Sequence, residues 1–197
     1  MKILVLVLLI LFLFPTFGMT LDRCNDFKED VRIQHTKYFG FDFPWWFGIG
    51  QLKQESGCRA NTTAWDLGQG IAQFMPATAK YINSLMGENL NPYKPEDGIK
   101  MQAYYMSIIY RGQKWSGKLW TAYQSYNGGE GNLVNEYKRA NELDWNAMLS
   151  QCHRKVVTLK SGEKLDFCKV NYDYSKQIYK YGNLYNTGNP VDNWEFW

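Results

Sequence analysis

Four cysteines constrain the fold of this chain more than any other feature, because each disulfide ties together two segments that lie far apart in the sequence. They are Cys24, Cys58, Cys152 and Cys168. An even number of cysteines behind a leader typical of exported proteins predicts two disulfides. No Cys-x-x-Cys spacing is present, so the cysteines do not indicate a zinc site. Of the three possible pairings we favour Cys24–Cys58 and Cys152–Cys168, because the second pair brackets a predicted β-hairpin and would join its ends.

The N-terminus carries the leader. Lys2 is followed by an unbroken apolar run over residues 3–14, and small residues occupy positions 16 and 18. This order is that of a secretory signal peptide, and the run is shorter than the ~20 residues of a membrane-spanning helix. The alternative is an uncleaved N-terminal anchor. We predict a signal peptide over residues 1–18, no stable membrane span after its cleavage, and export to the periplasm, the cell envelope or the extracellular space.

The remaining residues, 19–197, contain no internal repeat or interdomain linker, so we predict one domain with an aromatic C-terminal tail. We expect this tail to dock on the domain; disorder is the alternative. Hydrophobic periodicity, proline starts and glycine ends predict a mainly helical fold with one β-hairpin. The predicted helices span residues 45–55, 76–86, 96–110, 119–126, 130–140, 143–150 and 172–185, and the predicted strands span residues 155–159 and 164–167.

Charge and composition limit the classes of partner. The formal net charge is +3, and removal of Lys2 with the signal peptide leaves +2. No basic block stands out, so nucleic acid is not an expected partner. A weak positive charge is compatible with an anionic polymer such as a cell wall. Aromatic residues make up 17% of the chain; such rings are stacking platforms in secreted sugar-binding proteins, although most of them are expected in the core.

Several enzyme classes are excluded by the absence of their motifs. The chain has no P-loop, no Gly-x-Gly-x-x-Gly and no Gly-x-Ser-x-Gly. Its two histidines, His35 and His153, have neighbours that fit neither a catalytic triad nor a zinc motif. The acidic pairs at residues 29–30 and 96–97 are interpreted as solvated helix starts. We therefore expect no metal and no cofactor.

The candidate catalytic residue is Glu55, near the end of the predicted helix 45–55. Trp45, Ile49 and Leu52 fall at helical spacing and form a core-facing side of that helix. Glu55 lies three residues beyond Leu52, at the edge of this face. Partial desolvation there would raise the pKa of Glu55 and suit it to donate a proton. No second acid has a motif context, which favours a mechanism with one carboxylate.

Four segments stand in order along the chain. They are Glu55-Ser56, then GIAQFMPATA over residues 70–79, then Asn91-Pro92 followed by Ile99 and Tyr105, and finally AYQSYNGG over residues 122–129. This set resembles the soluble lytic transglycosylases, lysozyme-like enzymes that cleave peptidoglycan. The resemblance covers residues 43–132 and is weaker over residues 172–185, where Tyr174 and Ile178 echo the last helix of the family.

The resemblance implies roles for individual residues. Glu55 matches the catalytic acid/base of the family, and Tyr126 matches a tyrosine whose hydroxyl reaches the catalytic centre. The positions that match substrate-binding residues are Gln73, Met75, Tyr105, Tyr126 and Asn127. Helix capping and core packing are the alternatives for Gln73 and Met75, and helix capping is the alternative for Asn127.

The chain also departs from the family pattern. Ala64 stands where the family usually has a serine able to assist the acid, nine residues after the glutamate. Cys58 replaces a bulky apolar residue, Gln102 replaces a common glycine, and Val170 replaces a frequent acidic residue. These changes concern the shape of the groove and the surroundings of Glu55, not the acid itself.

The implied fold is a mainly α, lysozyme-like α+β domain with a small disulfide-bracketed hairpin. The implied activity is that of a peptidoglycan lytic transglycosylase, which cleaves the β-1,4 bond between N-acetylmuramic acid and N-acetylglucosamine and forms 1,6-anhydromuramic acid. The alternatives are a goose-type lysozyme-like hydrolase and a non-catalytic module that binds peptidoglycan or chitin. The expected partner is the peptidoglycan glycan strand, and we expect the protein to be a monomer.

Overall fold

The computed structural model of the chain describes residues 22–112 and 118–188. The predicted signal peptide and residues 189–197 of the tail lie outside the described residues, so both predictions stay untested. The elements are, in order, η1 Arg23–Phe27, α1 Lys28–Phe39, α2 Trp46–Ser56, α3 Pro76–Met86, α4 Pro95–Gly112, α5 Leu119–Gly128, α6 Glu130–Ala140, α7 Trp145–Ser150, β1 Val156–Thr158, β2 Lys164–Asp166 and α8 Phe167–Asn183.

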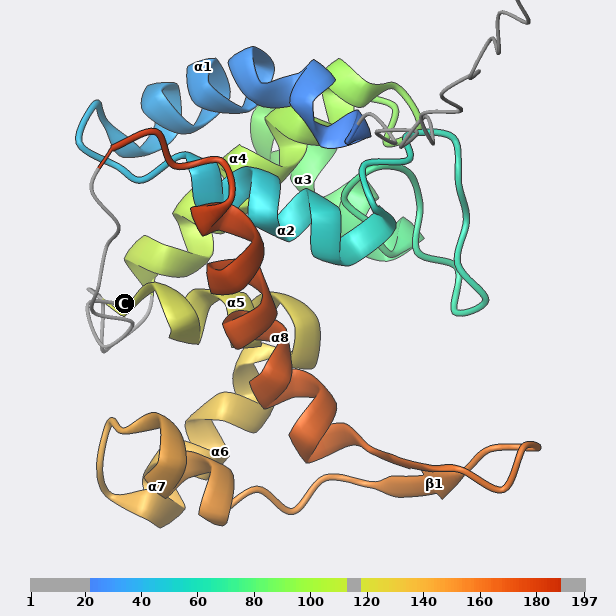
Figure 1. Cartoon of the computed structure of the whole chain (residues 1–197), viewed down its shortest axis with the longest axis vertical. Helices are drawn as coiled ribbons and strands as arrows, with labels where there is room; N and C mark the ends of the chain where they lie inside the picture. The colour runs from blue at the N-terminus through green and yellow to red at the C-terminus, as the bar shows by residue number, and fades with distance from the viewer. Residues whose placement is uncertain (1–21, 113–117, 189–197) are drawn as a thin grey trace, which may run out of the picture.

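Helices make up most of the described part, and β1 and β2 form a small antiparallel sheet (Figure 1). This arrangement confirms the predicted fold class. Most predicted helices agree with the observed ones within a few residues at each end. None of the helices in the described ranges is both long and apolar enough to cross a membrane.

Helix α1 is not among the predicted elements. Its sequence is mostly polar, and only Val31 and His35 are buried, so no apolar periodicity marks it. Glu29 and Asp30 lie in its first turn, where carboxylates interact favourably with the helix dipole. The interpretation of this acidic pair as a helix start is therefore correct, although the helix itself was missed.

Helix α8 begins at Phe167 and not at residue 172, and β2 correspondingly ends at Asp166. The carboxylate of Asp166 accepts hydrogen bonds from the backbone N–H groups of Cys168 (2.8 Å) and Lys169 (3.3 Å). A side-chain acceptor at this position satisfies N–H groups that have no partner within the helix. The strand therefore passes directly into α8, without the loop that the sequence pattern predicts.

Helix α2 lies at the centre of the fold, where it packs most extensively against α8 (Figure 1). Ile49 and Leu52 are fully buried, as predicted, and Trp45 is half-buried before the first turn. The two helices approach so closely that a Cβ atom on Gly50 would lie 2.4 Å from the carbonyl oxygen of Ile178. Only glycine fits at this crossing, because real Cβ atoms essentially never approach backbone to under 3.0 Å.

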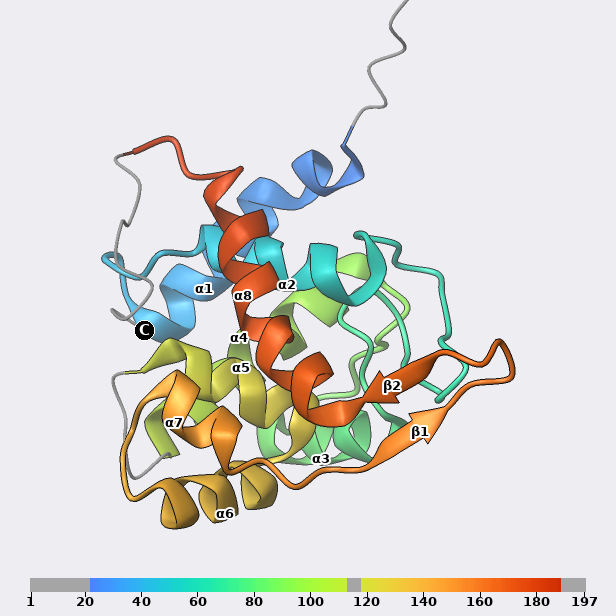
Figure 2. The same ribbon diagram turned by 60° about the horizontal axis from the view of Figure 1, so that its bottom comes forward.

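The β-hairpin projects from one side of the helical body (Figures 1 and 2). Its register pairs Val156 with Asp166 and Thr158 with Lys164. The Cys152–Cys168 disulfide joins the segment before β1 to the first turn of α8. The ends of the hairpin are therefore held together covalently, in the pairing that the sequence favoured.

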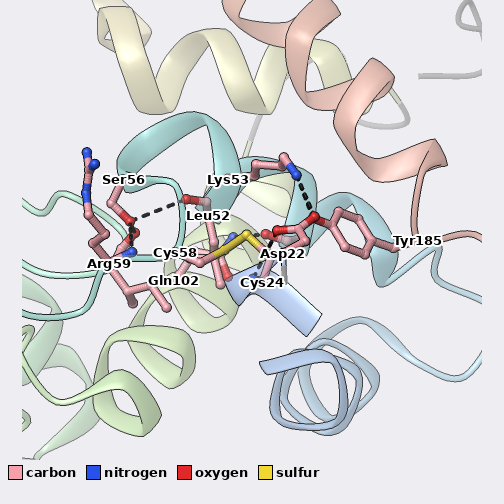
Figure 3. Close-up of a disulfide and its surroundings, with 11 residues drawn as sticks. Asp22, Cys24, Leu52, Lys53, Ser56, Cys58, Arg59, Gln102 and Tyr185 are labelled. Atoms are coloured by element: carbon pink, nitrogen blue, oxygen red, sulfur yellow. Dashed lines mark hydrogen bonds and ion pairs between the residues drawn. A yellow bond between two sulfur atoms is a disulfide. The ribbon is translucent and has the colours of Figure 1, made fainter. Parts of the chain in front are cut away.

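The second disulfide, Cys24–Cys58, ties η1 to the residues that follow α2 (Figure 3). An ion pair reinforces the same region: Lys53 Nζ donates to Asp22 Oδ2 (2.6 Å) and to the hydroxyl of Tyr185 (3.0 Å). That hydroxyl in turn donates to Asp22 Oδ2 (2.5 Å). The start of the described chain, the last turn of α2 and the segment after α8 are therefore joined at one point.

We predict that Gly50→Ala destabilises the protein by about 3 kcal/mol or more, because the added methyl group has no space at the α2–α8 crossing. Urea unfolding followed by circular dichroism measures the effect. The matched control is Gly131→Ala on α6, where no atom lies within 4 Å of the added Cβ; it should be neutral or stabilise by about 0.5–1 kcal/mol. Similar stabilities for the two variants would contradict the close crossing.

Candidate active site

Glu55 lies in the last turn of α2, and the residues on either side of it hold that turn in place. The backbone N–H of Cys58 donates to the carbonyl of Leu52 (3.2 Å), and Cys58 is fully buried in its disulfide. The departure from the family at position 58 is therefore a covalent connection in place of a bulky apolar contact. Figure 3 shows how this disulfide lies directly against the end of α2.

Ser56 connects the helix end to the next motif. Its hydroxyl donates to the carbonyl of Ile71 (2.8 Å) and accepts from the backbone N–H of Arg59 (3.0 Å). The side chain is buried. Glu55 thus supplies the carboxyl group, and the neighbouring Ser56 anchors the loop over residues 70–75 through its hydrogen bond to Ile71.

That loop turns sharply and has a fixed shape. Gly70 has φ 71, and a Cβ there would lie 1.7 Å from the carbonyl oxygen of Pro92; both facts require glycine. Gln73 adopts φ 53, unusual for a residue with a side chain, and its Nε2 donates to the carbonyl of Gly70 (2.7 Å). Gln69 and Phe74 exchange two backbone hydrogen bonds (2.9 and 3.0 Å).

Aromatic residues from two helices pack against this loop. The Tyr126 ring lies 5.9 Å from Phe74 and 5.6 Å from Tyr105, measured between centroids. The Tyr126 hydroxyl donates to the carbonyl of Ala72 (2.7 Å). Burial raises the pKa of Tyr126 well above its ordinary value, and the charge of Glu55 contributes to the rise. The Tyr126 hydroxyl therefore lies near Glu55, but its proton is donated to the Ala72 carbonyl and not to Glu55.

The direct partner of Glu55 is Tyr174 on α8, whose hydroxyl donates to Glu55 Oε1. Gln51 stands one helical turn before Glu55 on the same face of α2, and its Nε2 donates to the oxygen of Tyr174 (3.1 Å). Behind it, Gln102 Nε2 on α4 donates to Gln51 Oε1 (2.6 Å) and to the carbonyl of Gly48 (3.3 Å). Gln51 and Gln102 are both fully buried.

The direction of this chain of hydrogen bonds is set by the Gly48 carbonyl. A carbonyl only accepts, so Gln102 must present its NH₂ group there, and the same group meets Gln51 Oε1. The NH₂ group of Gln51 then faces Tyr174, whose oxygen accepts this bond. The hydroxyl proton of Tyr174 is consequently directed to Glu55.

Burial raises the pKa of Glu55 from its ordinary 4.5 to about 8; the hydrogen bond from Tyr174 opposes this rise, and the negative charge of Asp66 adds to it. The direction agrees with the sequence prediction. A carboxyl group with this pKa is mostly protonated at neutral pH and can donate a proton. In the ionised state, the Tyr174 hydroxyl stabilises the carboxylate.

The remaining sequence-predicted residues lie at different depths. Tyr105 is half-buried in the aromatic group, whereas Met75, directly before α3, is 43% exposed. Asn127 is exposed at the end of α5, and its Nδ2 donates to Asn171 Oδ1 (2.8 Å). Ala64 lies in a turn in which its N–H donates to the carbonyl of Gly68 (2.9 Å).

Sequence reasoning missed the three residues that hold Glu55. Tyr174 was noted only as a feature of the last helix, Gln102 only as a departure from a glycine, and Gln51 not at all. A buried glutamine at a helix–helix contact is a usable signal, because its amide must find partners there. The hydroxyl that Ala64 does not supply to Glu55 comes from Tyr174.

A comparison with models of known protein families finds one that matches the part of the chain that carries Glu55. The model described as the transglycosylase SLT domain matches residues 51–149, half of the chain. The chain belongs to the transglycosylase SLT family. The matched segment includes Glu55, Gln73, Tyr126 and Gln102, and ends before the hairpin and α8.

Solved structures share the fold of this SLT protein. The 70 kDa soluble lytic transglycosylase of Escherichia coli is 18% identical with a TM-score of 0.59, and the match covers 78% of this chain and 23% of that one. An inactive glutamate-to-glutamine mutant of the lytic transglycosylase Slt of Pseudomonas aeruginosa is 18% identical with a TM-score of 0.64, covering 84% and 25%. The chain thus spans about a quarter of the length of these enzymes. Comparison with curated proteins gives no significant match.

We predict that Tyr174→Phe, Gln51→Met and Gln102→Met each raise the pH at which Glu55 titrates in this SLT protein. Tyr174→Phe removes the donor to the carboxylate, and the glutamine variants free the Tyr174 hydroxyl to turn away or to accept from the protonated acid. The effect should be largest for Tyr174→Phe. Carbon NMR of the Glu55 carboxyl group measures it.

The control for these variants is Gln124→Met on α5. Gln124 is fully buried, and its amide makes no hydrogen bond within the described residues. A glutamine-to-methionine change there should leave the titration of Glu55 unchanged. A shift in the control equal to that in Gln51→Met would show that the effect is one of packing and not of hydrogen-bond direction.

We also predict that Glu55→Gln stabilises the protein in a pH-dependent way. The native protein keeps a proton on Glu55 up to about pH 8, whereas the unfolded chain loses it near pH 4.5, so the wild type loses stability as the pH rises through this window. The gain in free energy of unfolding should be small at pH 4 and about 1–3 kcal/mol at pH 8. Urea unfolding at both pH values tests this. The exposed Glu142→Gln is the control, and a gain independent of pH would contradict the prediction.

Proposed function

We propose that this SLT protein is a peptidoglycan lytic transglycosylase that cleaves the β-1,4 bond between N-acetylmuramic acid and N-acetylglucosamine. The observation that carries the proposal is the partly buried carboxyl group of Glu55, with its raised pKa and a hydroxyl donor directed at it. Membership of the family supports the reaction class. The inactive mutant of the Pseudomonas relative carries a glutamate-to-glutamine change, and in that enzyme a glutamate is therefore required.

In the first step, protonated Glu55 donates its proton to the glycosidic oxygen, and the bond from that oxygen to C1 of the muramic residue breaks. The N-acetylglucosamine side leaves with a new hydroxyl group. The acetamido group of the substrate stabilises the positive charge that develops at C1. A raised pKa is what this step requires, because the acid must hold its proton at neutral pH.

In the second step, ionised Glu55 removes the proton from the C6 hydroxyl of the muramic residue, and the C6 oxygen bonds to C1. This closes the 1,6-anhydro ring and returns the proton to Glu55. The internal hydroxyl replaces water because it is already held next to C1. Between the two steps the Tyr174 hydroxyl stabilises the carboxylate, and no second carboxylate is needed.

The groove residues have supporting roles in this proposal. Gln73 and Tyr105 line the substrate beside the scissile bond, together with the exposed Met75. Tyr126 holds the loop through the Ala72 carbonyl and presents its ring to the substrate. Asn127 extends the binding surface toward the hairpin.

Digestion of purified sacculi with mass analysis of the products tests the proposal. The wild type should release muropeptides one water lighter than hydrolysis products. Glu55→Gln should lower the rate by about 100-fold or more, since it removes the acid/base, while Glu142→Gln should leave it unchanged. Near-wild-type cleavage by Glu55→Gln would end this account, and binding without any cleavage by the wild type would favour a non-catalytic module.

A goose-type lysozyme-like hydrolase is the second candidate, and one observation favours it. The negative charge of Asp66 raises the pKa of Glu55, so a second carboxylate lies within electrostatic reach of the first. Such a carboxylate could activate water as a general base. In that case the products would carry reducing-end muramic acid, and Asp66→Asn would lower their formation by about 100-fold. Anhydro products that persist in Asp66→Asn would support the transglycosylase.

We also propose that the protein is exported through its N-terminal leader. The proposed substrate lies outside the cytosol, and all four cysteines are paired in disulfides, as is usual for proteins of oxidising compartments.

A further inference from the structure

A pocket of about 730 Å³ lies beside the Glu55 site, between the loop at residues 65–66 and the β1–β2 hairpin. The loop and the hairpin project from the same side of the helical body (Figures 1 and 2). Asp66 and Asn127 line the pocket at the end nearest the catalytic region. The hairpin and α8 lie outside the segment that the family model matches.

The floor of the pocket contains an ion pair, Arg154 with Glu136, whose two charges cancel. Arg154 Nε and Nη2 donate to the two oxygens of Glu136 (2.8 and 3.1 Å), and the Tyr172 hydroxyl also donates to Glu136 (2.8 Å). Glu136 is 1% exposed. A Cβ on Gly128 would lie 2.1 Å from Arg154 Nη1, so Arg154 is packed into the floor. This pair shapes the pocket and adds no net charge to it.

Two other cations on the pocket wall have no carboxylate partner in the described residues. Lys155, just before β1, is exposed and forms no ion pair there, and Arg139 on α6 donates only to the carbonyl of Gln151 (2.9 Å). His153 lies on the same wall. The acid that faces the pocket without a cationic partner in the described ranges is Asp66, on the loop side. The wall formed by α6 and the segment before β1 therefore carries an excess of positive charge.

The pocket also presents amide and aromatic groups. Asn171 is 1% exposed and lines the pocket, yet its Nδ2 has no hydrogen-bond partner within the described residues. A buried amide without a partner is costly unless a ligand supplies an acceptor. On the loop side, Trp65 is 87% exposed, and a ring this exposed offers its face to a sugar.

We propose that this pocket binds the anionic peptide attached to the muramic residue of peptidoglycan, with the peptide carboxylates on Arg139 and Lys155 and a peptide carbonyl on Asn171. Trp65 carries the adjoining sugar. The inference rests on the proposed function, and it names a part of the substrate beyond the bond that is cleaved. Carboxylates suit guanidinium and ammonium groups because charge-assisted hydrogen bonds are the strong ones. A glycan strand without the peptide offers only one lactyl carboxylate on each muramic residue, too few for both cations.

Calorimetric binding to the Glu55→Gln protein tests the proposal with two soluble probes. One is the disaccharide that carries a stem tetrapeptide, and the other is the same disaccharide without the peptide. The peptide-bearing probe should bind at least about tenfold more tightly, and Lys155→Glu and Arg139→Glu should each remove about tenfold of that affinity. Binding of the bare disaccharide, whose lactyl group is its one carboxylate, should change far less in either variant. Added salt should weaken the peptide-dependent part.

The matched control is Lys160→Glu at the turn of the hairpin, an exposed lysine outside the pocket lining, which should leave both affinities unchanged. Equal affinity for the two probes, or equal losses in Lys160→Glu and Lys155→Glu, would overturn the proposal. The outcome is separate from that of the proposed function. Cleavage without peptide-dependent binding would contradict only the proposed peptide site. Peptide-dependent binding without cleavage would contradict only the proposed catalytic function.

Discussion

The close crossing of α2 and α8 is the constraint on which the rest of the site depends. Gly50 allows the backbone of α8 to approach α2 at Ile178, and Tyr174 stands one helical turn earlier on α8. At this distance the Tyr174 hydroxyl reaches both Gln51 and Glu55, which are one turn apart on α2. A side chain at position 50 would separate the helices, and the carboxyl group of Glu55 would lose the hydroxyl that faces it.

The sequence predicted the parts of the site that follow one another along the chain. Glu55 was inferred from four ordered segments that resemble the family, α3 from its proline start, and the disulfides from the even cysteine count and the predicted hairpin. The contacts between Tyr174 and Glu55, and between Gln102 and Gln51, join residues more than fifty positions apart, and no spacing rule encodes them. Helix α1 was missed because it buries too little apolar surface to show periodicity. The early start of α8 depends on a capping carboxylate at the end of a strand, where a loop was expected.

The surroundings of Glu55 balance two opposed demands. Burial favours the protonated form of the carboxyl group, whereas the Tyr174 hydroxyl favours the ionised form. A residue that must give up a proton and then take one back needs both forms to be accessible. The family pattern places a serine hydroxyl nine residues after the glutamate; in this chain Ala64 has none, and the hydroxyl on Glu55 comes from α8. The polar pair Gln51 and Gln102 extends this arrangement through the core to a backbone carbonyl.

The Cys24–Cys58 bond has a consequence for the cell that makes the protein. It closes directly behind the helix turn that carries Glu55, and such bonds do not persist in the reducing cytosol. A newly made chain therefore lacks this support for as long as it remains inside. If the chain is exported as proposed, the turn that carries Glu55 gains this bond only on reaching an oxidising compartment, and oxidation becomes a step of its maturation.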